Sequence, residues 1–126
     1  MATNKNLDSR INEYSYKMIN DNKNNNEVKN LIDKALGVLC NDGVYGYYVF
    51  CKSKKGGNIQ KIYIEDIVKE FAKEFNLNLK NNNPYDYDEF FIKLSEDLHQ
   101  LLFFKDIVEK ILIYARYHDK ALGEKK

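Results

Sequence analysis

An almost uninterrupted apolar run, VYGYYVFC at residues 44–51, dominates this chain of 126 residues. It follows the turn-forming triplet NDG and precedes a lysine-rich stretch, KSKKGG, at residues 52–57. Tyrosine, valine and phenylalanine suit a strand, and residues 59–64 could supply a hairpin partner. A hairpin with two apolar faces needs a further element to cover it, whereas a buried helix accommodates apolar residues all round. The pattern is compatible with a strand or a helix over residues 44–53 and slightly favours the helix.

Elsewhere, apolar residues recur at spacings of three and four, which is typical of amphipathic helices. The chain contains a single proline, Pro84, whereas a β-sandwich or barrel usually needs more residues that interrupt regular structure. We therefore predict an all-α fold, a compact bundle of about six helices forming a single domain over residues 1–126, with residues 1–6 disordered. The predicted helices span residues 7–20, 27–40, 44–53, 61–76, 86–98 and 105–122, with a break at 99–104.

Three short signals refine the helix ends. Asp42 is expected to cap the segment that follows the NDG triplet, and Gly46 to let a neighbouring helix approach closely. Asp86 and Glu89 have the spacing of a capping box at the start of a helix. The two cysteines, Cys40 and Cys51, have no metal-ligand spacing and are interpreted as small buried apolar residues of a protein in a reducing compartment.

The first twelve residues are mostly polar and the longest apolar run is too short to span a bilayer, so we expect a cytoplasmic protein without membrane contact. The net charge of +1 is unevenly distributed along the chain. Residues 52–64 carry four lysines and no acid, whereas residues 65–104 carry four basic and nine acidic side chains. The molecule is therefore expected to be dipolar, with a local basic patch and an acidic face.

Residues able to perform catalysis or bind metal are sparse. The two histidines, His99 and His118, have no second base or nucleophile at a recognisable spacing. The acids of residues 86–97 fit helix starts and solvated helical faces, where they interact favourably with the helix dipole. The pair Gly56-Gly57 lacks the context of a phosphate-binding P-loop. We predict no catalytic residue, no metal site and no cofactor.

The lysines of residues 52–61 form the one constellation with a functional interpretation. Point charges of this kind bind nucleic-acid backbones independently of sequence. A solvated loop explains the same residues, and composition alone leaves both interpretations open.

Two runs resemble one known family. NDGVYGYYVFCKSK at residues 41–54 and ILIYARYHDKAL at residues 111–122 resemble the small subunit of the type III-B (Cmr) CRISPR RNA-targeting effector complex. The resemblance covers nearly the whole chain, although Tyr114 stands at the family's usual tryptophan and the paired basic residues of its last helix reduce to Arg116 followed by Tyr117.

This resemblance implies an all-helical, non-catalytic structural subunit that functions in antiviral defence. It implies as partners the other subunits of the effector complex, further copies of itself in a minor filament, and the guide RNA and target RNA. Contacts to phosphates and to the shape of an A-form duplex need only a modest basic face. The predicted RNA-binding side chains are Arg10, Lys17, Lys52, Lys54, Lys55, Lys61, Arg116 and Lys120.

Three rival hypotheses remain at this stage. One is a helical adaptor that contacts only protein, and another is the related small subunit of a type III-A complex. The third is a small nuclease that uses His118.

Overall fold

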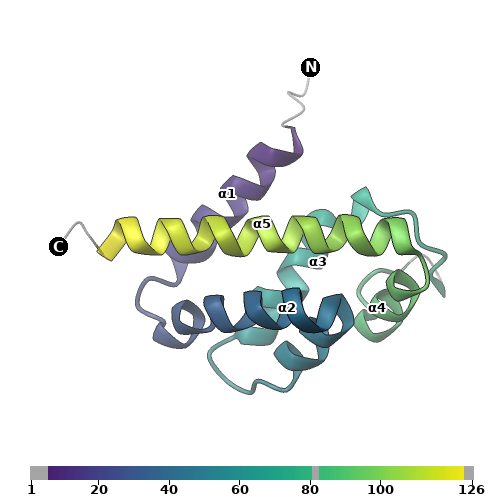
Figure 1. The fold of residues 1–126 in the computed structure, drawn as a ribbon, viewed down its shortest axis with the longest axis horizontal. Helices are drawn as coiled ribbons and strands as arrows, with labels where there is room; N and C mark the ends of the chain where they lie inside the picture. The colour runs from purple at the N-terminus through teal and green to yellow at the C-terminus, as the bar shows by residue number, and fades with distance from the viewer. Residues whose placement is uncertain (1–5, 81–82, 124–126) are drawn as a thin grey trace.

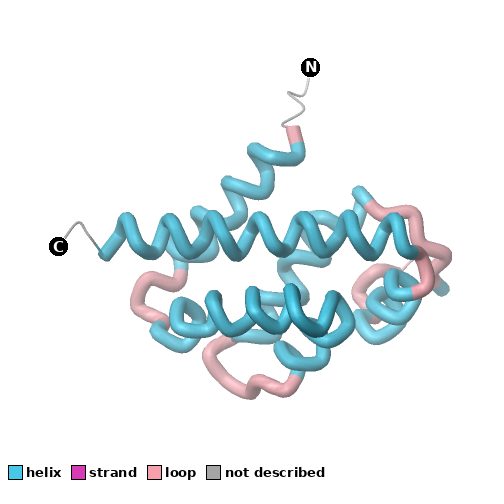
Figure 2. The backbone as a smooth tube through the Cα atoms, viewed as in Figure 1, coloured by secondary structure: helices cyan, strands magenta, loops and turns pink. Residues whose placement is uncertain are grey.

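The computed structural model describes residues 6–80 and 83–123; the predicted disorder of residues 1–5 lies outside these ranges, and Asn6 caps the first helix. Within them the chain forms helices and loops but no strand, which confirms the all-α prediction (Figure 2). The described residues form five α-helices rather than about six, because two predicted helices belong to one element. The α-helices are α1 (Leu7–Asp21), α2 (Asn26–Lys52), α3 (Asp66–Phe71), α4 (Tyr87–Ser95) and α5 (Leu98–Gly123), with a π-helical turn η1 (Lys61–Glu65) before α3 and a 3-10 turn η2 (Ala72–Glu74) after it.

Helix α5 is the centre of the bundle. It runs across the whole molecule and packs against both α1 and α2 (Figure 1). Its inward stripe is fully buried and consists of Phe104, Ile107, Val108, Ile111, Leu112 and Ala115. The contacting faces of α1 and α2 are apolar at the same helical spacing. The buried residues of these three helices include Ile11, Met18, Ile19, Val28, Ile32, Ala35, Leu39, Phe104, Ile107, Val108, Ile111, Leu112 and Ala115.

The break predicted at residues 99–104 is wrong. Helix α5 starts at Leu98 and continues without interruption, while α4 ends at Ser95. The side chain of Asp97 accepts a hydrogen bond of 3.2 Å from the backbone N–H of Gln100, so this carboxylate satisfies a free donor in the first turn. Phe104 is buried among other aromatic rings, which fixes residues 99–104 in the helix.

Gly43 bends α2 rather than ending it. Its backbone lies at φ 80° and ψ −174°, a conformation that joins two helical segments, residues 26–42 and 44–52, at an angle. This region of backbone conformation is essentially restricted to glycine. The second segment is helical, as the pattern favoured, and Tyr47 and Cys51 are buried in it. The bend brings Asp42 so close to Gly46 that a Cβ at position 46 would lie 2.7 Å from that of Asp42. Gly46 therefore accommodates its own helix and not a neighbouring one.

The predicted helix at residues 61–76 consists of η1, α3 and η2 in direct succession. In the π turn the N–H of Asp66 donates to the carbonyl of Lys61, five residues earlier. Two tyrosine hydroxyls from other helices donate to carbonyls inside this turn: Tyr14 to Ile62 and Tyr47 to Tyr63, each at 2.7 Å. These bonds attach the turn to α1 and α2 and fix the position of the lysine that begins it.

Candidate nucleic-acid interface

The loop between α2 and η1 carries the predicted lysine cluster in a defined conformation. Gly56, Gly57 and Asn58 all have positive φ, at 101°, 64° and 59°, so the chain reverses sharply there. The side-chain amide of Gln60 donates to the carbonyls of Lys52 and Lys54 at 2.9 and 3.0 Å. The carbonyl of Lys52, the last residue of α2, is thereby satisfied, and the loop is fixed against the helix end.

Acids from other elements neutralise two of the four lysines. Lys52 pairs with Asp88 of α4 at 2.8 Å, and Lys61 pairs with Asp66 at 2.9 Å. The hydrogen bond with Lys52 lowers the pKa of Asp88, and the hydrogen bond with Asp66 raises the pKa of Lys61. The stretch that carries no acid in the sequence is therefore not acid-free in space.

The other two lysines, Lys54 and Lys55, make no ion pair within residues 6–80 and 83–123. The ammonium group of Lys54 lies 4.6 Å from the ring centroid of Phe50, a cation–π contact. Lys55 is exposed. These two side chains present the net positive charge of the loop.

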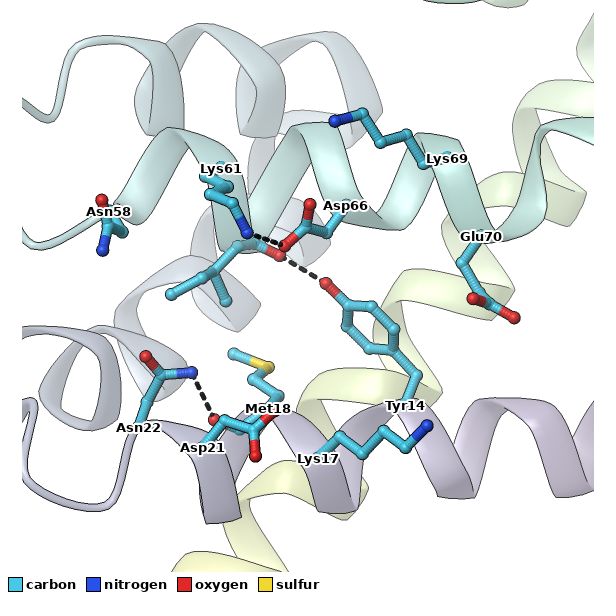
Figure 3. Close-up of a pocket in the computed structure, with 11 residues that line it drawn as sticks. Tyr14, Lys17, Met18, Asp21, Asn22, Asn58, Lys61, Asp66, Lys69 and Glu70 are labelled. Carbon is cyan, nitrogen blue, oxygen red and sulfur yellow. Dashed lines mark hydrogen bonds and ion pairs between the residues drawn. The ribbon is translucent and has the colours of Figure 1, made fainter.

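Two adjoining hollows extend this charge beyond the loop. One, of about 290 Å³, follows the loop and includes Lys54 and Lys61. The other, of about 480 Å³, lies between α1 and the η1–α3 stretch and includes Lys17, Lys61 and Lys69 (Figure 3). Because both hollows contain Asn58 and Lys61, we treat them as one feature, the lysine groove, defined by Lys17, Lys54, Lys61 and Lys69.

The lysine groove also contains acids, so its formal charge is balanced. The pair of Lys61 with Asp66 lies along the η1–α3 side of the groove, and the hydroxyl of Tyr14 points toward the same side from α1 (Figure 3). Neither Lys17 nor Lys69 is ion-paired within the described part of the chain, and both therefore remain available to an anion. The four acids lining the groove are Asp21, Glu65, Asp66 and Glu70.

Sequence reasoning did not single out Lys69. It lies eight residues after Lys61, two turns further along the same helical stretch. The spacing of Lys61 and Lys69 indicates a shared groove only when α1 is known to pack alongside, because Lys17 of α1 lines the opposite side.

Arg10, one of the predicted RNA-binding side chains, makes its contacts within the protein. Its guanidinium donates to the carboxylate of Glu74 and to the carbonyl of Glu70, both at 2.7 Å. It also lies 5.1 Å from the ring centroid of Phe71. With these donors engaged, Arg10 attaches α1 to the end of α3, and its assignment as an RNA contact stays a prediction.

The two predicted C-terminal cations lie on α5, and the structure does not bring them into the lysine groove. Arg116 pairs with Asp33 of α2 at 3.1 Å, whereas Lys120 is exposed. His118 lies 3.1 Å from the side-chain oxygen of Asn12 and contacts the ring of Tyr16 edge-on. The histidine named in the nuclease hypothesis is thus held between α1 and α5.

The acids at the start of α4 bind backbone N–H groups of this chain. Asp86 caps α4 by accepting from the N–H of Glu89 at 3.2 Å, but the Glu89 carboxylate accepts from the N–H of Lys80, so the capping box is half formed. Within residues 6–80 and 83–123, no three His, Cys, Asp or Glu side chains are grouped to hold a metal ion. No helix in the described part is both long enough and apolar enough to cross a membrane.

The prediction that both cysteines are buried is wrong for Cys40. Cys51 is buried, but Cys40 is exposed and its Sγ lies 3.5 Å from a carboxylate oxygen of Glu109. Desolvation and this carboxylate raise the pKa of the Cys40 thiol, which keeps it in the less reactive protonated form.

Comparison with protein-family models, with curated proteins and with solved structures gives no match to this chain.

Proposed function

We propose that the protein is a non-catalytic small subunit of a type III-B CRISPR effector complex that contacts the guide–target RNA duplex or the target strand through the loop between α2 and η1 and through the lysine groove. In this role it functions in antiviral defence and contacts the other subunits and further copies of itself. The observation that carries the proposal is the position of Lys54 and Lys55. Lys54 ends the run that resembles the family and Lys55 directly follows it, and both lie on a fixed loop without a carboxylate partner in the described residues.

The chemistry of this surface suits a phosphate backbone. Lys54, Lys55, Lys17 and Lys69 are cations without a bound carboxylate in the described ranges. Lys54 lines one of the two adjoining hollows and Lys17 and Lys69 line the other, whereas Lys55 is exposed on the loop itself. Lysine ammonium groups bind phosphates as point charges and carry no base specificity. A subunit that leaves sequence recognition to a guide RNA needs nothing more.

The test is RNA affinity of the double variant Lys54→Glu/Lys55→Glu, measured by fluorescence anisotropy with an RNA duplex over a range of salt concentrations. Each phosphate contact contributes about one unit to the slope of log affinity against log salt, so the variant should bind more weakly and with a slope lower by about two.

The matched control is Lys34→Glu/Lys73→Glu, which changes the net charge equally at two exposed positions outside the lysine groove. If both variants lose affinity to the same extent, only net charge matters. In that case, or if neither variant differs from the wild type, the loop is not the RNA contact.

A helical adaptor without RNA contact is the second candidate function, and one observation favours it. Four of the eight predicted RNA-binding side chains, Arg10, Lys52, Lys61 and Arg116, are paired with acids of this same chain. An adaptor would recover the same protein partners after nuclease treatment and would bind no RNA duplex.

A further inference from the structure

The larger hollow of the lysine groove, of about 480 Å³, has the size of a small-ligand site. Helix α1 and the η1–α3 stretch run antiparallel along it. Arg10 donates to the carbonyl of Glu70, whereas Tyr14, one turn further along α1, donates to the carbonyl of Ile62, eight residues earlier. The order of side chains along one wall is therefore reversed on the other.

The two ends of this hollow differ in their chemistry. Asp21, Asn22 and Asn58 lie at one end, and Lys17 and Lys69 lie towards the other (Figure 3). Lys17 precedes Asp21 by four residues, which is about 6 Å along a helix. The hollow thus presents a carboxylate and two amides at one end and ammonium groups about one turn away.

A phosphate alone does not match this hollow. Its lining includes three lysines and three acids, so its formal charge is zero. Two of the acids have a cation of this chain nearby: Asp66 pairs with Lys61 at 2.9 Å, and Glu70 lies 3.8 Å from Arg10. The third, Asp21, forms neither a hydrogen bond nor an ion pair within residues 6–80 and 83–123.

The position of Asp21 favours a ligand that donates hydrogen bonds. It is the last residue of α1, and the last turn of this helix contains no basic residue. A carboxylate is unfavourable at the negative end of a helix dipole, so a donor bound there is stabilising. The side-chain amide of Asn58 also makes no hydrogen bond to the described part of the chain. Both groups are thus available to the same ligand.

Apolar atoms lie between the two polar ends. The ring of Tyr14 and the side chains of Met18 and Ile62 line this part of the hollow (Figure 3). The hydroxyl of Tyr14 is already bonded to the carbonyl of Ile62 at 2.7 Å. Such a lining suits the flat face of a nucleobase, whose polar groups lie on its edge and on the attached phosphate.

We propose that the larger hollow binds one unpaired nucleotide of an RNA strand, with its phosphate at Lys17 and Lys69 and its base at Asp21 and Asn58. Carboxylates accept from the amino group of cytosine, whereas uracil has no amino group. The site therefore prefers a base with an exocyclic amino group. This inference rests on the proposed RNA contact, because the two hollows share Asn58 and Lys61 and a strand that passes the loop reaches the larger one.

The experiment measures the affinity of the full-length protein for single-stranded hexamers of cytidine and of uridine by fluorescence anisotropy. The two strands carry the same phosphates, so the ratio of their affinities reports the base. We expect the cytidine hexamer to bind at least about fivefold more tightly. Cytidine monophosphate, measured by competition, separates a free nucleotide from one in a strand. It should bind more weakly than the hexamer, because it makes no contact with the loop.

The variant Asp21→Ala should reduce this ratio to about one without weakening the uridine hexamer, because it removes the acceptor together with a negative charge. The matched control is Asp42→Ala, which removes the same charge at an exposed position outside both hollows and should keep the wild-type ratio. A purely electrostatic role of Asp21 would change the affinities of both hexamers equally.

Three outcomes overturn the proposal. The first is equal affinity of the wild type for the two hexamers. The second is a ratio that Asp21→Ala leaves unchanged. The third is tighter binding of cytidine monophosphate than of the hexamer, which would assign the hollow to a free nucleotide. Binding of an RNA duplex in any of these cases leaves the proposed function standing, whereas absence of binding to every RNA contradicts both.

Discussion

Hydroxyl groups of buried tyrosines connect the helices of this bundle through backbone carbonyls. Tyr47 donates to the carbonyl of Tyr63, and Tyr63 donates in turn to the carbonyl of Val28 at the start of α2. Burial raises the pKa of Tyr47 well above its ordinary value, so the hydroxyl keeps its proton and remains a donor. Within the described residues, no buried side-chain nitrogen or oxygen lacks a partner. These contacts give the π turn its fixed position.

Replacing Tyr47 by Phe should lower the free energy of unfolding by about 1–3 kcal/mol, because the buried carbonyl of Tyr63 loses its tyrosine donor. Urea denaturation followed by circular dichroism measures the change. The matched variant Tyr16→Phe removes a hydroxyl from a side chain that is 51% exposed and should stay within about 0.5 kcal/mol of the wild type. Equal stabilities of the two variants would show that the hydroxyl of Tyr47 contributes nothing.

At the scale of the element, the bend in α2 decides how the bundle is arranged. The first segment contacts α5 and the second contacts α4. The bend at one glycine therefore lets the same helix pack against two different neighbours. Beyond the bend, Leu98 and Leu102 at the beginning of α5 are more than half exposed.

The variant Gly43→Ala should lower the free energy of unfolding by about 1–3 kcal/mol, because alanine is strained at φ 80° and ψ −174°. Gly37→Ala in the same helix is the control, since its added Cβ would have no atom within 4 Å apart from its chain neighbours and the backbone of its own helix. Alanine is the better helix former there and should stabilise by about 0.5–1 kcal/mol. Opposite signs of the two changes, measured by thermal unfolding, are the expected result; destabilisation by both or by neither would contradict the role of the bend.

Periodicity predicted the helices and their buried stripes, but not where some of them join. In residues 99–104 the apolar residues LLFF lack a clean helical stripe, since Leu102 is exposed while Phe104 is buried. The exposed leucine belongs to the uncovered side of α5, and that is visible only when α2 is seen to turn away. A local pattern cannot report the direction of a distant helix.

At the scale of the whole molecule, the fold places acidic side chains beside lysines whose own stretch of sequence contains no acid. The lysines of residues 52–61 are a continuous basic segment in the chain, yet Asp88 from α4 and Asp66 from α3 neutralise two of them. The sequence located the cluster, and the fold determined which members remain free. Conversely, Lys69 and Lys17 come from separate helices and meet in one groove, which required the packing of α1 against the η1–α3 stretch.

The most direct measurement of the proposed function is purification of the tagged full-length protein from its native cells, followed by identification of the bound proteins and sequencing of the bound RNA. We expect recovery of RNA-guided effector subunits together with short guide RNAs carrying a constant repeat sequence. We also expect that Lys54→Glu/Lys55→Glu retains these proteins and recovers less target RNA. Recovery of protein partners with no guide RNA, or of no effector subunit at all, would contradict the account.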